Sequence, residues 1–127
     1  MKTFYAIAPV FFRLRGIQTA MLITVGSKTG QERAVQLSVF ADGSDAWVVI
    51  ASAAGAAKHP GWFFNMARNP DKIWLQFGGR KVRVNADTLQ GPDRDTAWQR
   101  VVAKWPGYEG YRKKTDRDIP VIRLTAA

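Results

Sequence analysis

AMLITVGSKTGQERAVQLSVF, residues 20–40, says most about how this chain folds. Residues 20–25 form a short apolar run that ends at a glycine, which is typical of a buried strand. Residues 33–40 alternate between apolar and polar side chains, which is the period of a strand with one buried face. Residues 26–30 begin and end with glycine and suit a hairpin connection. The stretch therefore predicts two antiparallel strands joined by a tight turn.

Similar patterns extend this pair into a larger sheet. Further strands are expected over residues 47–51, 72–77, 80–88 and 119–124. Helices are expected from Pro60 to the Asn69-Pro70 break, over residues 91–104 and, as a short turn, over residues 108–113. Strands joined by hairpins favour an antiparallel sheet over a doubly wound parallel one. We predict a mainly β, α+β fold in which about six antiparallel strands curl into a small barrel with flanking helices.

The chain is long enough, at 127 residues, to bury a sizeable core as one domain, residues 1–127. Its core should hold the apolar residues that alternate along the strands or share one face of the first helix. From the strands these are Val35, Leu37, Val39, Ile73, Leu75, Phe77, Val82, Val84 and Ala86. From the helix they are Trp62, Phe63, Met66 and Ala67.

Composition narrows the chemistry and the partners. The chain has no cysteine and one histidine, which argues against disulfides, thiolate catalysis and a zinc site, so no metal is expected. Its 19 Lys and Arg residues against 10 Asp and Glu give a net charge of +9, which indicates an anionic partner. The basic residues are dispersed rather than gathered in a dense block, so a phosphorylated ligand or a membrane surface is favoured over nucleic acid.

Residues 1–16 are aromatic and basic, without the apolar centre and cleavage site of a signal peptide. We expect a helical segment that packs near the active site, and contact with a membrane surface is the alternative. No stretch of the sequence is long enough to span a bilayer. The expected location is the cytoplasm, with peripheral attachment at the inner face of the plasma membrane under the alternative. Oligomeric state stays open.

Two short stretches are suited to holding an anion. In residues 26–33, GSKTGQER, backbone N–H groups of a turn lie beside Lys28 and Arg33. An ordinary exposed turn is the alternative reading. In residues 52–62, SAAGAAKHPGW, small residues would let a flat ligand approach the backbone before a helix on which Trp62 and Asn65 share a face. A loop ahead of a core helix with a buried Trp62 is equally compatible.

The sequence shows no catalytic triad, metal set or pair of carboxylates, so an enzyme of this kind would rely on a bound cofactor. His59 stands alone and is expected at a helix start or on the surface. Trp105, Tyr108 and Tyr111 recur at near-helical spacing. They either pack the second helix onto the barrel or wall a substrate pocket in which a phenol donates a proton.

The ordered motifs GSKTGQER (26–33), KHPGW (58–62) with Asn65, Asn69-Pro70, WPGYEGY (105–111) and TDRDIPV (115–121) resemble the deazaflavin-dependent nitroreductase family of actinobacteria. The resemblance runs from about residue 20 to residue 124. It implies a split β-barrel, reduced 8-hydroxy-5-deazaflavin (coenzyme F-420) as hydride donor, and quinones, nitroaromatics or other activated unsaturated compounds as small hydrophobic substrates. The coenzyme carries a phosphodiester and several glutamates, which suits a basic protein.

The resemblance also implies roles for individual positions. Lys28, Thr29, Gly30 and Arg33 match the hairpin that binds the coenzyme's tail. The positions matching the ring pocket and the adjoining loop and helix start are Gln36, Ser38, Ile50, Ser52, Ala53, Lys58, Gly61, Trp62 and Asn65. Tyr108 and Tyr111 match tyrosines that line the substrate pocket, and they are the candidate catalytic residues.

This chain departs from the family pattern at several positions. Ser27 replaces an arginine, and Ala53 replaces a lysine whose charge-assisted contact would contribute about 1–3 kcal/mol. Ser38 stands where an aromatic residue is familiar, and Trp105 stands where a tyrosine is. Two alternatives therefore stay open: a split-barrel oxidoreductase that binds FMN, and a non-catalytic split-barrel protein that binds a lipid or another hydrophobic ligand.

Overall fold

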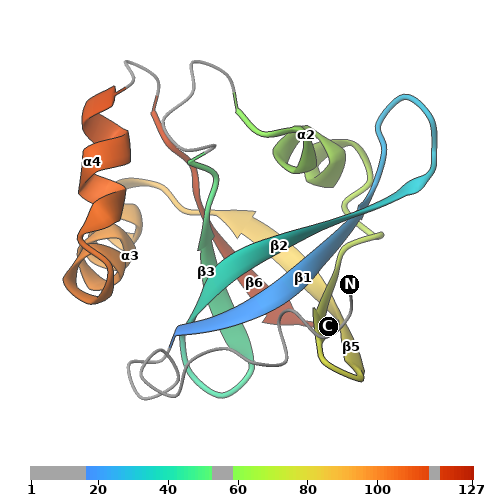
Figure 1. The fold of residues 1–127 in the computed structure, drawn as a ribbon, viewed down its shortest axis with the longest axis horizontal. Coiled ribbons are helices and arrows are strands. Elements are labelled where there is room, and N and C mark those ends of the chain that lie inside the picture. Colours follow the sequence, from blue (N-terminus) through green and yellow to red (C-terminus); the bar gives the residue numbers. More distant parts are fainter. Residues whose placement is uncertain (1–16, 53–58, 115–117) are drawn as a thin grey trace.

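The computed structural model describes residues 17–52, 59–114 and 118–127 (Figure 1). Within these ranges the chain forms six strands and three helices, close to the expected order. They are β1 (Ile17–Val25), β2 (Glu32–Ala41), β3 (Ala46–Ile50), α2 (Gly61–Arg68), β4 (Trp74–Phe77), β5 (Arg80–Thr88), α3 (Gly91–Lys104), α4 (Gly107–Lys114) and β6 (Val121–Ala126). The helix expected in residues 1–16 lies outside the described residues.

The strands form a closed barrel in the order β1-β2-β3-β6-β5-β4. Every neighbouring pair is antiparallel, and the pairing of β4 with β1 closes the sheet on itself. The predicted barrel is thereby confirmed. Figure 1 shows α2 near one end of the barrel, beside the β1–β2 hairpin, and the pair α3 and α4 on another side, next to β3. Among the described residues no helix combines the length and apolarity needed to cross a bilayer.

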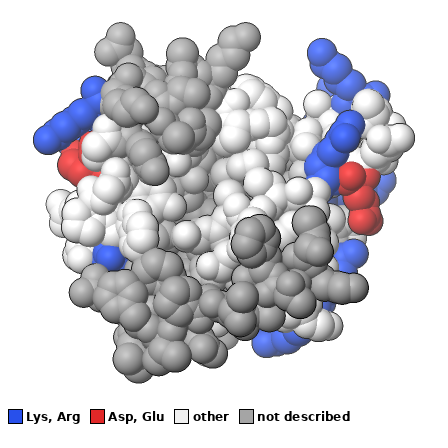
Figure 2. All heavy atoms as spheres, in the orientation of Figure 1, with Lys and Arg blue, Asp and Glu red and all other residues white. Residues whose placement is uncertain are grey.

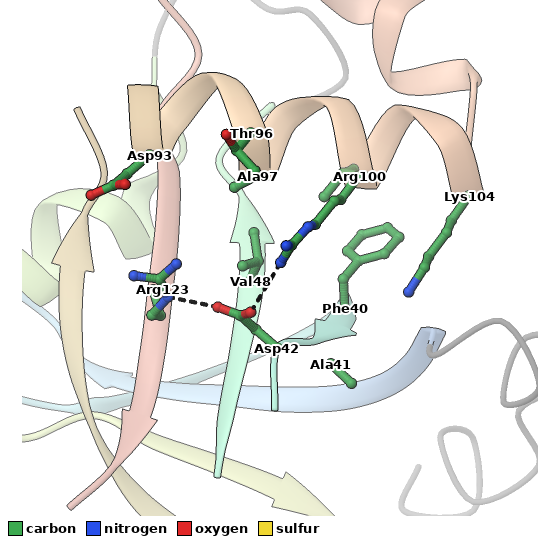
Figure 3. Close-up of a pocket in the computed structure, with 11 residues that line it drawn as sticks. Phe40, Ala41, Asp42, Val48, Asp93, Thr96, Ala97, Arg100, Lys104 and Arg123 are labelled. Carbon is green, nitrogen blue, oxygen red and sulfur yellow. Dashed lines mark hydrogen bonds and ion pairs between the residues drawn. The ribbon is translucent and has the colours of Figure 1, made fainter. Parts of the chain in front are cut away.

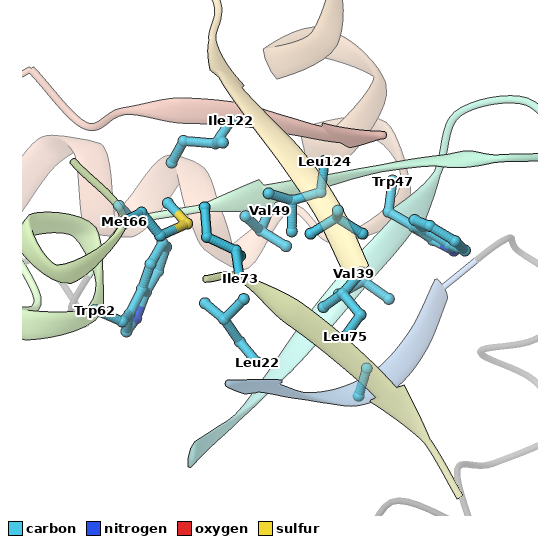
Figure 4. Close-up of a cluster of buried hydrophobic side chains, with 13 residues drawn as sticks. Leu22, Val39, Trp47, Val49, Trp62, Met66, Ile73, Leu75, Ile122 and Leu124 are labelled. Carbon is cyan, nitrogen blue, oxygen red and sulfur yellow. The ribbon is translucent and has the colours of Figure 1, made fainter. Parts of the chain in front are cut away.

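Two apolar clusters stabilise the barrel. The first fills its interior, where Leu22, Leu75 and Val84 are fully buried and Trp62 and Met66 of α2 close one end (Figure 4). The second lies outside the barrel wall, where α3 covers β3 and β6. Burying one large apolar side chain such as Leu or Val contributes about 1.5–3 kcal/mol. The first cluster therefore holds α2 against the sheet, and the second holds α3 against it.

Two residues expected in the core are exposed. Ala86 lies in the last part of β5, where residues 85–88 are exposed on both faces, so alternation there does not mark a core face. Ala67 lies one residue beyond Met66, which points inward together with Trp62 one helical turn earlier. A step of one residue turns a helical side chain by about 100°, which carries Ala67 out to solvent.

Candidate functional site

The residues predicted to edge the ring pocket lie where β2 and β3 separate. β2 pairs with β1 along almost its whole length, whereas its ladder with β3 holds two residue pairs in the part of the chain described. β3 then continues to Ile50 while it pairs with β6, and Figure 1 shows β2 and β3 running apart. Gln36 and Ser38 on β2, and Ile50 and Ser52 at the end of β3, therefore border a region that no ladder between these strands bridges.

These four side chains differ in how far they are accessible. Gln36 is exposed and Ser38 is half-buried, so both polar groups can meet a ligand on the outer face of β2. Ile50 is buried in the second apolar cluster, so its side chain contributes to packing rather than to the accessible surface. Ser52 is also buried, directly after the strand, where a small polar group suits a close approach of backbone and ligand.

The β1–β2 hairpin is a compact turn held by its own hydrogen bonds. The Gly26 N–H donates to the Gln31 carbonyl at 2.7 Å, and the Gly30 N–H donates to the Gly26 carbonyl at 3.0 Å. The Thr29 hydroxyl accepts from the Gln31 N–H at 3.3 Å and from the Arg33 guanidinium at 3.5 Å. Gly30 has φ +72°, a conformation that glycine adopts without strain. The turn therefore sets the backbone from which Lys28 and Arg33 project.

Asn65 fastens this hairpin to α2. Its side-chain carbonyl accepts the Ser27 N–H at 3.1 Å, and its amide donates to the Thr24 hydroxyl at 3.1 Å. The Asn69 amide adds a 3.4 Å hydrogen bond to the Val25 carbonyl. Both functional groups of Asn65 are thus used within the protein, and we call these contacts of Asn65 and Asn69 the asparagine clamp. Asn65 was predicted as a ligand contact, whereas its visible contacts are with the hairpin.

Thr24 and Asn69 were not predicted at this site, although the sequence held one signal for Thr24. Thr24 is the single hydroxyl within an apolar run, and it is 1% exposed. A buried hydroxyl in a strand needs a hydrogen-bond partner. An amide on a nearby helix is a natural donor, but the sequence does not say which helix approaches.

The cations of the hairpin face solvent. Lys28 and Arg33 are both exposed. Figure 2 shows basic atoms over the β1–β2 hairpin beside an acidic group, while the surface between the hairpin and the helix pair is mostly uncharged in this view. A long anion could therefore bind its charged part at the hairpin and its apolar part nearer β3.

Trp62 occupies the core. Its side chain is 8% exposed and belongs to the interior cluster together with Met66. This agrees with the alternative interpretation of the sequence, in which Trp62 is buried on a core helix. A stacking role for its ring on a ligand stays a prediction. Gly61, the first residue of α2, is exposed, and beyond its own helix and chain neighbours no atom of the described residues lies within 4 Å of the position that a Cβ would take.

Tyr108 lies on α4, which Figure 1 shows on the side of β3 away from α2. Its ring is half-buried and meets the Phe40 ring edge to face, with the ring centroids 5.8 Å apart. α4 is held by Glu109, which accepts hydrogen bonds from Arg112 at 2.6 Å and from the Trp98 indole at 3.2 Å. These two donors, Arg112 first, lower the pKa of Glu109 below its ordinary 4.5 because they stabilise the carboxylate.

Three predicted site residues cannot be placed fully. Ala53 and Lys58 lie outside the described residues, and of Tyr111 the structure describes the backbone, within α4. His59, expected at a helix start or on the surface, is half-buried just before α2, and its ring centroid lies 4.9 Å from that of Phe63. Within the described ranges no cluster of three His, Cys, Asp or Glu side chains could hold a metal ion.

A hollow of about 230 Å³ lies elsewhere, between α3 and the outer wall of the barrel. None of the predicted site residues whose side chains the structure describes lines it. Two of the predicted site residues, Ala53 and Lys58, lie outside the described part of the chain, so the site is described by its other borders. Those borders are a basic turn, two polar strand positions and, on the far side of β3 from the turn, a helix with Tyr108, which suit an anionic ligand with a flat, less polar end.

Comparison with known proteins points the same way. Residues 6–126 match the family described as F420H(2)-dependent quinone reductase. An F420H(2)-dependent quinone reductase of Mycobacterium tuberculosis is 37% identical over 117 residues, which cover 89% of this chain and 77% of that protein. A solved F420-H2-dependent reductase (FDR-A) is 34% identical with a TM-score of 0.73, and the match covers 84% of this chain and 92% of that one. The haem storage protein HutZ of Vibrio cholerae shares the fold at 15% identity and a TM-score of 0.63, over 93% of this chain and 86% of its own.

Proposed function

Because this chain belongs to the F420H(2)-dependent quinone reductase family, we propose that it is an oxidoreductase that reduces quinones with reduced coenzyme F-420. Nitroaromatic and other activated unsaturated compounds are proposed as further acceptors. When bound, the 8-hydroxy-5-deazaflavin ring supplies the hydride. The structural observation that supports this proposal is the basic hairpin, which the asparagine clamp fastens beside the separating ends of β2 and β3.

The hairpin is proposed to bind the acidic tail of the coenzyme. Lys28 and Arg33 supply charge, and Thr29 holds the Arg33 guanidinium toward the turn. Gln36 and Ser38 would hydrogen-bond the polar edge of the ring from β2, and Ser52 would do so from the end of β3. These side chains come from strands that the barrel holds rigidly, so the ring is oriented and water is kept from one of its faces.

The acceptor is proposed to bind toward α4. The Tyr108 ring already packs on Phe40, so the protein fixes its position before any substrate arrives. The Tyr108 hydroxyl, or water, is proposed to deliver the proton that accompanies reduction. Tyr111 joins this role from the sequence resemblance. Lys58, Gly61, Trp62 and Asn65 remain proposed coenzyme contacts, with Asn65 also positioning the hairpin.

The proposed partners are thus the coenzyme and a small apolar acceptor, with no nucleic acid. The dispersed basic residues of the sequence support this choice. A cytoplasmic location, with residues 1–16 as the segment for peripheral membrane contact, is a proposal that rests on the sequence.

Equilibrium titration of the purified protein with coenzyme F-420 and, separately, with FMN tests the proposal. The parent protein should bind the deazaflavin and not FMN. The double variant Lys28→Ala/Arg33→Ala should bind it about 100-fold more weakly, because two charge-assisted contacts of about 1.5 kcal/mol each are lost.

The matched control is Arg80→Ala/Lys81→Ala, which removes two exposed cations from the β4–β5 hairpin instead. It should leave the affinity unchanged. Tighter binding of FMN would move the protein to the flavin class. Equal affinity of the parent and the Lys28/Arg33 variant would remove the hairpin from the proposal.

A further inference from the structure

The hollow beside α3 has an apolar floor and a charged rim. Phe40, Val48 and Val101 form the floor and are buried, with exposures of 3%, 5% and 1%. Around the rim lie Arg100 and Lys104 from α3 and Arg123 from β6 (Figure 3). An apolar floor with a few converging polar groups is typical of small-molecule sites.

The two arginines of the rim are aimed by one carboxylate. Asp42 accepts from the Arg123 Nε at 2.6 Å with one oxygen, and its other oxygen lies 3.5 Å from an Arg100 nitrogen. Figure 3 shows both guanidinium groups directed toward Asp42. A guanidinium carries five N–H donors, so in the described part of the chain most donors of each arginine are not used by Asp42.

Charge favours an anion here. Among the described lining residues are three cations, Arg100, Lys104 and Arg123, and two acids, Asp42 and Asp93. The Arg100 side chain is 70% exposed, and a pair as long and exposed as its contact with Asp42 contributes little stability. A ligand carboxylate can therefore engage Arg100 at little cost to the fold.

We propose that this hollow is a second ligand site, which takes a small aromatic carboxylate. The ring lies on Phe40, Val48 and Val101, and the carboxylate meets the free donors of Arg100 and Arg123. Guanidinium groups favour carboxylates because the two planar groups can form paired hydrogen bonds. The volume of about 230 Å³ is below the roughly 300 Å³ at which sites for drug-sized molecules begin, so the ligand is small.

The site is separate from the proposed coenzyme site, and Phe40 lies between the two regions. Its ring forms part of the hollow and also packs against Tyr108 of α4. Among the described residues, none of those proposed to hold the coenzyme lines the hollow. The inference goes beyond quinone reduction and does not depend on it.

Benzoate is the probe, with benzyl alcohol as the neutral compound of the same shape. Methyl resonances of Val48 and Val101 are followed by NMR in the full chain during titration. Benzoate should shift them saturably with a Kd of about 1 mM or tighter, as expected for a ligand of this size. Benzyl alcohol should bind at least about tenfold more weakly, because it lacks the charge.

Variants and competition complete the test. Arg100→Gln should raise the Kd for benzoate about fivefold, whereas Arg80→Gln, an exposed arginine on the β4–β5 hairpin, should not change it. Saturating coenzyme F-420 should not displace benzoate. The proposal is overturned by methyl shifts that do not saturate, by equal binding of benzyl alcohol, or by displacement with the coenzyme. Failure of the protein to bind the coenzyme at all would instead affect the proposed function and leave this site standing.

Discussion

Removing the asparagine clamp should loosen the hairpin and cost measurable stability. In Asn65→Leu, a side chain of similar size loses one hydrogen bond to the Thr24 hydroxyl and one from the Ser27 N–H. Thr24 is 1% exposed, so its hydroxyl is left without a partner, at a cost of about 1–3 kcal/mol. Ser27 is exposed, and water replaces its lost contact at little cost. We expect a total loss of about 1–3 kcal/mol in the free energy of unfolding.

Urea unfolding of a double-mutant cycle isolates the contact. Thr24→Val removes the hydroxyl while keeping the shape of the side chain, and we expect it to cost about 1 kcal/mol. In the double variant both polar partners are absent. Its loss of unfolding free energy should therefore be smaller than the sum of the two single-variant losses by about 1 kcal/mol or more. Additivity within about 0.5 kcal/mol would show that the Thr24–Asn65 hydrogen bond does not hold the hairpin.

The same variant separates positioning from direct ligand contact. Asn65→Leu should weaken coenzyme binding, because the turn that carries Lys28 and Arg33 is no longer fixed. If its role is positioning, Asn69→Leu should weaken binding in the same direction, since Asn69 holds the Val25 carbonyl on the same strand. An unchanged affinity in Asn69→Leu together with a large loss in Asn65→Leu would favour a direct ligand contact.

Two further changes have clear expected outcomes. Gly26→Ala should destabilise the protein by about 1–3 kcal/mol, because the new Cβ would lie 2.7 Å from the Thr29 hydroxyl oxygen. Adding Thr29→Ala to the same chain should recover part of this loss. If thermal unfolding shows no recovery, the clash is refuted. Hydrogen bonds, above all the one from Arg112, lower the pKa of the Glu109 carboxyl, so this carboxylate stabilises the fold at pH values above its ordinary pKa of 4.5. The contribution is lost as the pH falls through the lower pKa that the group has in the folded protein. The difference in melting temperature between the parent and Glu109→Gln should therefore shrink on acidification below that pH, and a difference independent of pH would contradict this.

The strands could be predicted because their periods are local. Val35, Leu37 and Val39 alternate with polar residues along β2, and the register with β1 follows from the hairpin between them. The separation of β2 from β3 could not be predicted in the same way. Strand length says how far a strand runs, but not which neighbour it pairs with at each position. That choice depends on β6, which comes from the other end of the chain.

Side-chain roles at the site were harder to predict than the fold. The composition of residues 26–33 predicts a turn that is suited to an anion, and the structure confirms the hairpin while anion binding stays a prediction. The partner of the turn is an amide 38 residues from Ser27, on a helix whose placement depends on the whole core. Trp62 shows the converse. Its spacing suited a ligand as well as a core. The structure places it in the interior cluster with Met66, and its contact with the coenzyme stays a prediction.

β2 explains how one barrel wall can serve two places. Val39 points inward, so Ser38 and Phe40 on either side of it point outward, one toward the separating strands and one toward α3. Phe40 contributes to the floor of the hollow and packs on Tyr108 at the proposed substrate region. A shift of Phe40 on ligand binding in the hollow must therefore be accommodated by Tyr108 or by α3, since protein interiors leave little free volume. Any effect of a bound aromatic carboxylate on quinone turnover should accordingly pass through the contact between these two rings or through α3.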